Sequence, residues 1–556
     1  MHLVTTALEE TWPDEGPVLF LGEWCRRYSR RHVWEPIGGE VVPYHWDDRD
    51  RLEADYHSLQ SIQDDVLVDL AQCLNEIHGV DHGIRYWRIL LGPWLGLFVQ
   101  VLYDRWAMTV VHLDHNRVSE TALLDVEPMS LVPSGYSEFH QLSSDDMWNH
   151  YVFGRLLDEH TPISSRLIHR AGDIRSCADT YSITKTRTRP WKTRVLQGKT
   201  RVLQGFAHAS SLFVRNGDAM LISTYMPWRD ELRVQRALGQ VPALWTMIPR
   251  QQLVRVPPDS GCRVWSLENG SEDPFVQILR SWIASHVPTA YMEGYESLVE
   301  QSEKMGWPDR PSVVYTSNAH FKDEVFKVWV AERVERGVPL AIGQHGGHSG
   351  VGRFSSTNDH EIAISDRFFS WGWSDDNRPE VTPIGQLKGF QPLGVNHSVQ
   401  PDALLVLNVL PRYSYCLFDM PIAGQWIEYF EEQCTFVDEL PTRLRQALVV
   451  RFYEHEFGWD QEERWRDRYP DLSYQASSVD LISSIASTRI FISTYNGATF
   501  LESISMDVPT VIFWNTEHSS IADSAVEVFD LLGSLGIFHQ DPKSASRPLA
   551  PVWNDV

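Results

Sequence analysis

A chain of 556 residues that is 43% hydrophobic is long enough for more than one hydrophobic core, because single cores stop growing at roughly 250–300 residues. Its formal net charge of −25 argues against nucleic acid as a partner and against attachment of the whole surface to anionic lipid, since both need clustered Lys and Arg. The six scattered cysteines form no Cys-x-x-Cys pair, which fits reduced thiols in a cytosol.

The N-terminal part of the chain predicts a cytoplasmic protein with a helical insertion. Residues 1–10 have neither the basic nor the apolar region of a signal peptide, and no window reaches the ~20 apolar residues of a membrane span. Residues 18–21 predict an early strand, and a largely helical block follows from about His57 to Arg105. Its apolar stretch at 89–102 is interrupted by glycine and proline and predicts a buried helix.

A basic stretch from Arg166 to Arg201 stands out in this acidic chain. It ends in a perfect tandem heptapeptide, at 192–198 and 199–205. A solvated loop explains such a stretch in the ordinary way. The alternative is a docking surface for an anionic acceptor or for membrane headgroups, which would place the protein peripherally at the inner face of a membrane.

The next readable unit ends in a glycine-rich loop. Asn318 is placed to cap a helix that runs to Gly337, and residues 339–343 predict a strand. The loop at its carboxyl end follows, and in open α/β sheets that end binds ligands. This loop supplies the predicted acceptor side of a crevice, with Gln344, His345, Gly346, Gly347 and His348.

Three residues are candidates for the base that activates an acceptor. The glycines beside His345 let substrate approach closely, and an imidazole is a suitable general base at its natural pKa. Glu9 and Glu10, in the same lobe, are rivals. A metal site would instead combine His345, His348, Asp359 and His360, but their spacing matches no standard zinc pattern. We therefore expect no metal and no other cofactor.

The C-terminal part predicts a doubly wound lobe. Strands at 403–410, 447–453, 489–493 and 510–513 alternate with helices at 422–436, 479–487 and 498–506. We place the boundary near residue 378. The predicted fold is α/β with two Rossmann-type lobes, namely residues 1–378 with the helical insertion and residues 379–556 as the nucleotide-binding lobe.

The strand–turn–helix at 492–512 is the predicted donor site. The first N–H groups of its helix are suited to phosphate, and Glu502 could accept both ribose hydroxyls. An ordinary strand–helix–strand unit capped by Ser and Thr is the alternative. Arg451 and His455 close the neighbouring strand, where they could offset charge on a departing phosphate. The other predicted donor residues are Ser493, Thr494, Tyr495, Asn496 and Thr499.

These segments carry a resemblance to glycosyltransferases. The Ser-Thr turn with Glu502 and Pro509 resembles the donor lobe of the GT-B class, and 451–455 resembles its second donor motif, with His455-Glu456 in place of the usual His-Pro. Over nearly the whole chain, segments 5–13, 21–25, 85–94, 344–347, 364–373 and 513–515 resemble a family of surface-polysaccharide transferases. The order of 344–346, 365–366 and 384–385 is also similar to polyglycerol-phosphate and capsule transferases, which implies that His345 is the base in preference to Glu10.

The resemblance implies transfer of a sugar from a nucleotide donor to a glycan or lipid-linked glycan acceptor. The Ser-Thr turn with a His motif is similar to users of cytidine monophosphate sugars, the nonulosonate and Kdo transferases. Uridine and guanosine diphosphate sugars stay open as donors. A nucleotide-sugar epimerase or hydrolase is the rival enzyme, and a nucleotide-sensing scaffold is the rival without catalysis.

Overall fold

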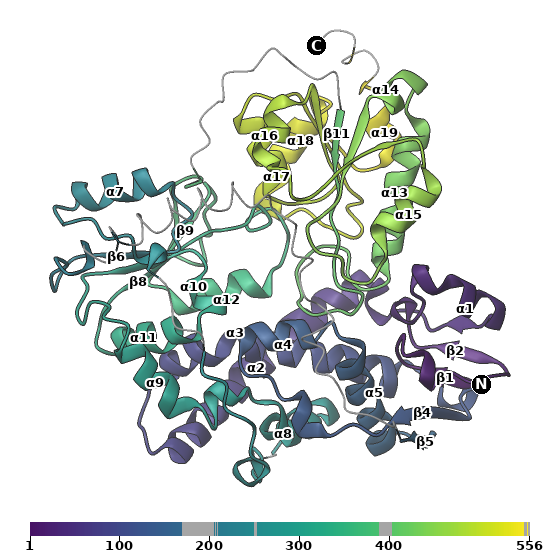
Figure 1. Ribbon diagram of the computed structural model, residues 1–556, viewed down its shortest axis with the longest axis horizontal. Helices are drawn as coiled ribbons and strands as arrows, with labels where there is room; N and C mark the ends of the chain where they lie inside the picture. Colours follow the sequence, from purple (N-terminus) through teal and green to yellow (C-terminus); the bar gives the residue numbers. More distant parts are fainter. Residues whose placement is uncertain are drawn as a thin grey trace.

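Three parallel sheets organise the protein, as seen in the computed structural model (Figure 1). The structure describes residues 1–169, 210–248, 253–268, 270–388 and 403–549, together with Gly205, Ala207 and Trp553. The predicted α/β class, with Rossmann-like sheets and an N-terminal helical insertion, is confirmed. The part before residue 378 holds two sheets, which the alternation of apolar segments did not reveal.

The first sheet is short-stranded and buried at its centre. Its strand order is β3-β2-β1-β4-β5, and every pair is parallel. The predicted early strand at 18–21 is confirmed as β2. The strands are β1 (His2–Val4), β2 (Val18–Phe20), β3 (Glu40–Val41), β4 (Glu120–Leu124) and β5 (Ser164–Ile168).

The helical insertion lies between the first two sheets in Figure 1. Its first helix, α2 (Arg49–His78), begins where Asp48 accepts a hydrogen bond from the Arg51 N–H and ends at Gly79, which has φ of 64°. The second, α3 (Ile84–Trp106), contains the apolar stretch at 89–102 and buries it completely, as predicted. Two more helices, α4 (Tyr136–Leu142) and α5 (Asp146–His160), pack against α3.

The second sheet has the order β10-β9-β8-β7-β6 and is also parallel. Its strands are β6 (Met220–Ile222), β7 (Val314–Thr316), β8 (Leu340–Gly343), β9 (Arg367–Ser370) and β10 (Val381–Pro383). Because β10 pairs with β9, it belongs to this sheet although it follows residue 378. The division of the chain at that residue stays a prediction.

The prediction of one continuous helix starting at Asn318 is wrong, because two helices occupy this segment. The first is the single turn α10 (Ala319–Lys322), which the Asn318 side chain does not cap; the Thr316 hydroxyl accepts the hydrogen bond of the Ala319 N–H instead, at 3.1 Å. The Asp323 carboxylate then accepts a hydrogen bond from the Phe326 N–H and starts α11 (Glu324–Glu335). The other helices encoded between its strands are α7 (Trp228–Ala237), α9 (Tyr295–Glu303) and α12 (Ser356–Ile364), together with α8 (Pro274–His286), which packs against α3 of the helical insertion.

The third sheet, in the green and yellow part of Figure 1, has the order β13-β12-β11-β14-β15-β16. Its strands are β11 (Ala403–Val406), β12 (Leu448–Arg451), β13 (Ser473–Gln475), β14 (Ile490–Ser493), β15 (Thr510–Phe513) and β16 (Phe538–His539). The helices α13 (Gln425–Glu439), α14 (Thr442–Gln446), α15 (Gln461–Arg468), α16 (Leu481–Ser487), α17 (Ala498–Ser505), α18 (Val526–Ser534) and α19 (Pro542–Ser546) accompany it. The predicted doubly wound lobe is confirmed. The order in which successive strands are added to the sheet reverses between β11 and β14.

The third sheet is tied to the rest of the molecule by the segment that follows β11. Apolar side chains between residues 413 and 423 belong to the same buried core as the helical insertion. In the same region Arg412 pairs with Asp146 of α5 at 2.6 Å. Phe418 also forms an isolated bridge with Ser355, just before α12. Among the residues that the structure describes, no helix is long and apolar enough to cross a membrane.

Candidate active site

His345 and Glu361 form an imidazole–carboxylate pair beside the second sheet. His345 lies in the loop after β8, and its Nδ1 is 3.0 Å from Oε1 of Glu361 on α12. Glu361 is 1% exposed, and the same oxygen is 3.2 Å from Nε2 of the buried His320 on α10. One buried carboxylate therefore lies between two imidazoles, and His345 is the imidazole that keeps partial exposure.

The burial and charges of this cluster set its protonation. Burial raises the pKa of Glu361, but the two histidines outweigh burial and lower this pKa to about 2. Burial lowers the pKa of His345, but the charge and hydrogen bond of Glu361 outweigh it and raise the pKa above its ordinary value. For His320, burial prevails and the pKa falls. Glu361 is therefore ionised at neutral pH, and His345 is the imidazole whose basicity it strengthens.

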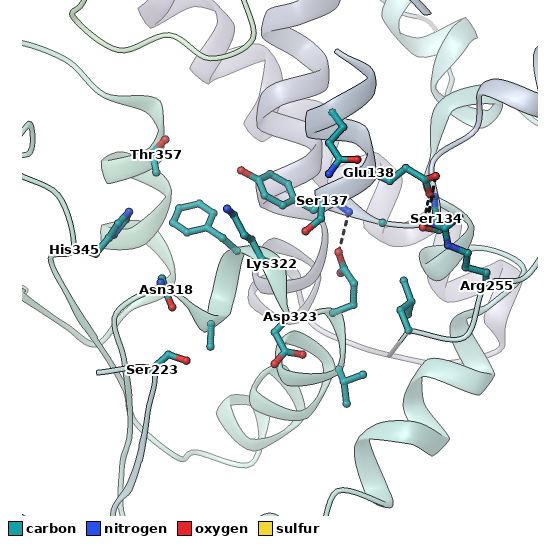
Figure 2. A pocket seen from close by; sticks show the side chains of 18 of the residues that line it. Ser134, Ser137, Glu138, Ser223, Arg255, Asn318, Lys322, Asp323, His345 and Thr357 are labelled. Carbon is teal, nitrogen blue, oxygen red and sulfur yellow. Dashed lines mark hydrogen bonds and ion pairs between the residues drawn. The ribbon is translucent and has the colours of Figure 1, made fainter. Parts of the chain in front are cut away.

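A cavity of about 850 Å³ opens next to His345 (Figure 2). Ser223, Asn318 and His345 line it from the loops that follow β6, β7 and β8, so it lies at the carboxyl edge of the second sheet. The opposite wall is the segment 134–141, which leads into α4. The cavity thus occupies the position at which open α/β sheets bind ligands.

The wall of the cavity is rigid and contains buried charges. The Glu324 carboxylate accepts hydrogen bonds from the Tyr136 N–H at 2.8 Å and the Tyr291 hydroxyl at 2.7 Å, and Lys327 pairs with it at 2.7 Å. In contrast, Lys322 extends toward the cavity in Figure 2 and makes no hydrogen bond or ion pair with another described residue. Sequence reasoning missed this wall, because α4 carries no motif and is distant in the chain.

Gln344 shapes the loop that carries His345. Its side-chain oxygen accepts hydrogen bonds from the Trp371 N–H and the Trp373 indole N–H, both at 2.8 Å. Its side-chain nitrogen donates to the Gly346 carbonyl at 2.7 Å. Gln344 therefore holds the shape of the loop, and its predicted acceptor-side role stays a prediction.

The same loop contacts the third sheet. A Cβ added at Gly347 would lie 2.6 Å from the Ala498 nitrogen and from Gly497, so the loop backbone packs directly against the start of α17. His348 is half-buried, and its Nδ1 is 3.2 Å from the Asn496 amide. The structure thus brings the predicted acceptor-side loop and the predicted donor turn together. Their roles stay predictions.

The hydroxyls of the donor turn already have acceptors within the protein. Ser493 donates to the Tyr495 carbonyl at 3.3 Å, Thr494 to the Val406 carbonyl at 3.1 Å, and Thr499 to the Tyr495 hydroxyl at 3.4 Å. Thr494, Tyr495 and Asn496 also line a cavity of about 20 Å³, which is room for about one water molecule. No side chain caps α17, however, so its first N–H groups keep the character of an anion site.

The remaining donor candidates lie around this turn. Glu502 is buried on α17, and its carboxylate is 3.0 Å from Nζ of Lys388. Arg451 ends β12, but its guanidinium donates to the Gln475 side chain at 2.6 Å and to the Val479 carbonyl at 2.7 Å, which holds the neighbouring loop. His455 is exposed in the loop after β12. Burial lowers the pKa of His140 on α4, and the charge of His455 contributes to the same shift.

Glu9 and Glu10 lie at the first sheet, after β1. Glu9 makes a bidentate ion pair with Arg30, at 2.5 and 2.6 Å, and this hydrogen bonding lowers its pKa. Glu10 is exposed. Neither carboxylate lines the cavity of about 850 Å³. The structure therefore does not bring them to His345.

The alternative metal site does not assemble. His345 pairs with Glu361, His348 contacts Asn496, Asp359 pairs with Arg378 at 2.7 Å, and His360 is buried against Gly92. Within the described ranges no group of three His, Cys, Asp or Glu side chains could hold a metal ion. Of the basic stretch, Arg166 lies on β5, and the part from Arg170 to Arg201 lies outside the described residues, as do both heptapeptides apart from Gly205.

Comparison with known proteins relates the whole chain to one family. The family model described as "LIC12162 family transferase" matches residues 1–556, and so includes all three sheets and the cavity. No curated protein matches the chain.

Proposed function

Since the chain belongs to the LIC12162 family of transferases, we propose that the group it transfers is a sugar, moved from a nucleotide donor to a carbohydrate acceptor. The observation that carries this proposal is the His345–Glu361 pair at the edge of a polar cavity of about 850 Å³. A sugar hydroxyl is a poor nucleophile until its proton is removed, so such a transfer needs a base beside the acceptor.

His345 is the proposed base. Glu361 contacts Nδ1, which fixes the orientation of the ring and leaves Nε2 to take the proton from an acceptor hydroxyl. The ionised carboxylate then stabilises the imidazolium that forms, as in other pairs of an imidazole and a buried carboxylate. Glu9 is a weaker candidate because Arg30 occupies its carboxylate.

The cavity suits a carbohydrate acceptor. Sugars present several hydroxyls around a flat apolar face, and they need both hydrogen-bonding groups and aromatic rings. The cavity supplies hydroxyls from Ser134, Ser137 and Ser223, an amide from Asn318, and the ring of Tyr225, which lies nearly parallel to His345 with an interplanar angle of 16°. We propose a glycan or lipid-linked glycan as acceptor.

We propose that the donor binds at the start of α17, with its phosphate on the uncapped N–H groups and its ribose near Glu502. The proposed donor class is a cytidine monophosphate sugar, such as a nonulosonic acid or a Kdo-like sugar. In the present structure Gly347 packs on the same helix start. Donor binding therefore requires the loop and α17 to move apart far enough to admit the phosphate.

Nucleotide binding tests the donor side. Thermal-shift measurements with cytidine, uridine and guanosine nucleotides compare the donor classes, since a ligand at 100 times its dissociation constant stabilises by about 2.7 kcal/mol. We expect cytidine monophosphate to stabilise the wild type and Glu502→Ala to weaken the effect. Stabilisation by uridine or guanosine diphosphate alone would transfer the proposal to that donor. No stabilisation by any nucleotide would remove the nucleotide donor.

Product analysis tests the acceptor side. We expect His345→Ala to keep nucleotide affinity within a few-fold and to lower transfer by the ~10²–10⁴ that positioned proton transfer contributes. Glu10→Gln is the matched control and should keep transfer. If Glu10→Gln abolished transfer and His345→Ala did not, the carboxylate would be the base. Release of free or isomerised sugar without any acceptor product would favour a hydrolase or an epimerase instead.

A further inference from the structure

Helix α7 is an amphipathic helix at the outer edge of the molecule. It lies beyond β6, the edge strand of the second sheet, at the far left of Figure 1. Its inner face is fixed by buried Leu232 and by Gln235, whose side chain makes hydrogen bonds of 3.0 and 2.8 Å to the Ala243 backbone. The helix is therefore preformed, and a partner on its outer face would not bear the cost of forming it.

The segment 228–241, which is α7 and the turn after it, exposes both cations and apolar side chains. It carries Arg229, Arg233 and Arg236, and Arg229 stacks on Trp228 with the guanidinium 5.3 Å from the ring centre. The exposed apolar side chains are Trp228 (40%), Val234 (39%), Leu238 (58%) and Val241 (43%). These seven residues, from Trp228 to Val241, are called the α7 surface below.

The acidic residues of this segment cancel part of its positive charge and leave an excess of cations. Within residues 228–241, all of which the structure describes, the acids are Asp230 and Glu231. Asp230 pairs with Arg233 at 2.7 Å. Glu231 is buried against Thr224 on the inner face. The α7 surface is thus locally positive in a chain whose formal net charge is −25.

We propose that the α7 surface docks the protein on an anionic lipid surface. Helices that lie in a membrane interface carry Arg beside Trp, Leu and Val, because the cations meet the headgroups while the apolar side chains enter the acyl boundary. Each cation near an anionic surface contributes a modest attraction, so three cations with four apolar side chains give weak, salt-sensitive binding. The acidic remainder of the chain is repelled, which selects a single orientation.

Docking in this orientation would bring the cavity close to the lipid surface. Tyr225, which lines the cavity, is followed after two residues by Trp228 at the start of α7. An acceptor linked to a lipid could then reach His345 without leaving the membrane. This consequence rests on the proposed function, but the docking itself does not.

Flotation with vesicles tests the proposal. The full-length protein is mixed with vesicles of phosphatidylcholine containing 30 mol% phosphatidylglycerol, or with phosphatidylcholine alone, at low salt and at 0.5 M salt. We expect the wild type to bind the anionic vesicles at low salt and to be released by 0.5 M salt. Reversing the three arginines of the α7 surface should weaken binding by about 100-fold or more: the variant is R229E/R233E/R236E.

Two further variants separate charge, apolar contact and folding. V234S/L238S/V241S should bind more weakly and leave the salt dependence in place. A control with the same change in net charge reverses three exposed cations elsewhere, K304E/R336E/R466E, and should bind like the wild type. Melting temperatures verify that each variant is folded.

The proposal is overturned if the wild type ignores anionic vesicles, or if it binds neutral vesicles equally well. It is also overturned if R229E/R233E/R236E binds like the wild type. If instead reversal of the arginines at 187, 189, 194 and 201 alone abolished binding, docking would be assigned to the basic stretch.

Discussion

Replacing Glu361 by Gln isolates the part of the chemistry that depends on one buried charge. The substitution keeps the shape of the side chain and removes the carboxylate that lies 3.0 Å from Nδ1 of His345. Without that charge, burial and the positive charges of Lys388 and Lys322 remain, and all three lower the pKa of His345. Two effects follow: the base becomes weaker, and the imidazolium formed during transfer loses its stabilisation.

The magnitude follows from the geometry. Two unit charges 3.0 Å apart attract by about 5.5 kcal/mol at an effective dielectric constant of about 20, which sets an upper bound for the pair. Burying a carboxylate that is 1% exposed cancels part of it. If about 3 to 5 kcal/mol of the attraction is present in the transition state, Glu361→Gln lowers the transfer rate by about 10²- to 10⁴-fold.

The assay is the pH dependence of transfer. The base acts when unprotonated, so the wild-type rate should rise with pH through the raised pKa of His345. In Glu361→Gln the rising limb should move to lower pH while the maximal rate falls. Nucleotide-induced stabilisation, measured on the same samples, should persist. A variant whose rising limb stays where the wild type has it, or whose maximal rate is unchanged, would refute the role given to Glu361.

Three other outcomes are expected. Gly347→Ala should lower transfer at least about 10-fold and the free energy of unfolding by ~1–3 kcal/mol, because its Cβ would meet the backbone at the start of α17 at 2.6 Å. Gly346→Ala is the control and should be tolerated, because nothing lies within 4 Å of its Cβ. Equal behaviour of the two variants in activity and melting assays would contradict the close contact. Burial lowers the pKa of His286 to about 4, below its value in the unfolded chain. The free energy of unfolding should therefore fall by roughly 3 kcal/mol, from this residue, as the pH drops from about 6.5 to about 4. His286→Gln should flatten the dependence of the melting temperature on pH. Lys388→Met leaves buried Glu502 unpaired and should lower the free energy of unfolding by about 1–3 kcal/mol in denaturant titrations. Adding Glu502→Gln should restore most of this loss in the double variant. If the single variant lost no stability, the ion pair of 3.0 Å would not form in solution.

The third sheet could be predicted because its strands are short apolar runs whose ends are marked locally. The unit of β14, α17 and β15 was predicted to within one residue of its observed bounds, since Val, Ile and Phe alternate there with Ser, Thr and a Pro corner. His345 could be singled out for the same reason, because it follows a strand and precedes two glycines. Local sequence is enough when one segment carries the whole feature.

The partners of these features depend on contacts between distant segments. Glu361 lies on α12, 16 residues after His345, and no spacing rule connects a helix residue to that loop. The cavity wall at 134–141 comes from α4, about 200 residues earlier in the chain. The hydroxyl of Thr494 fits a phosphate turn in the sequence, and the tertiary structure gives it the Val406 carbonyl of β11 as its acceptor. Burial and pairing of this kind arise only when the sheets assemble.

The segment that follows β11 limits how such a protein can evolve. Tyr413, Leu417 and Ile422 are encoded with the third sheet, but they fill a core that the N-terminal helices build. Exchange of the third sheet between family members by recombination near residue 403 would bring foreign side chains into that core and leave them mismatched. If α17 binds the donor as proposed, new donor specificities should arise by stepwise substitution around it rather than by exchange of the whole third sheet. Sequence variation within the family should accordingly be correlated across this junction.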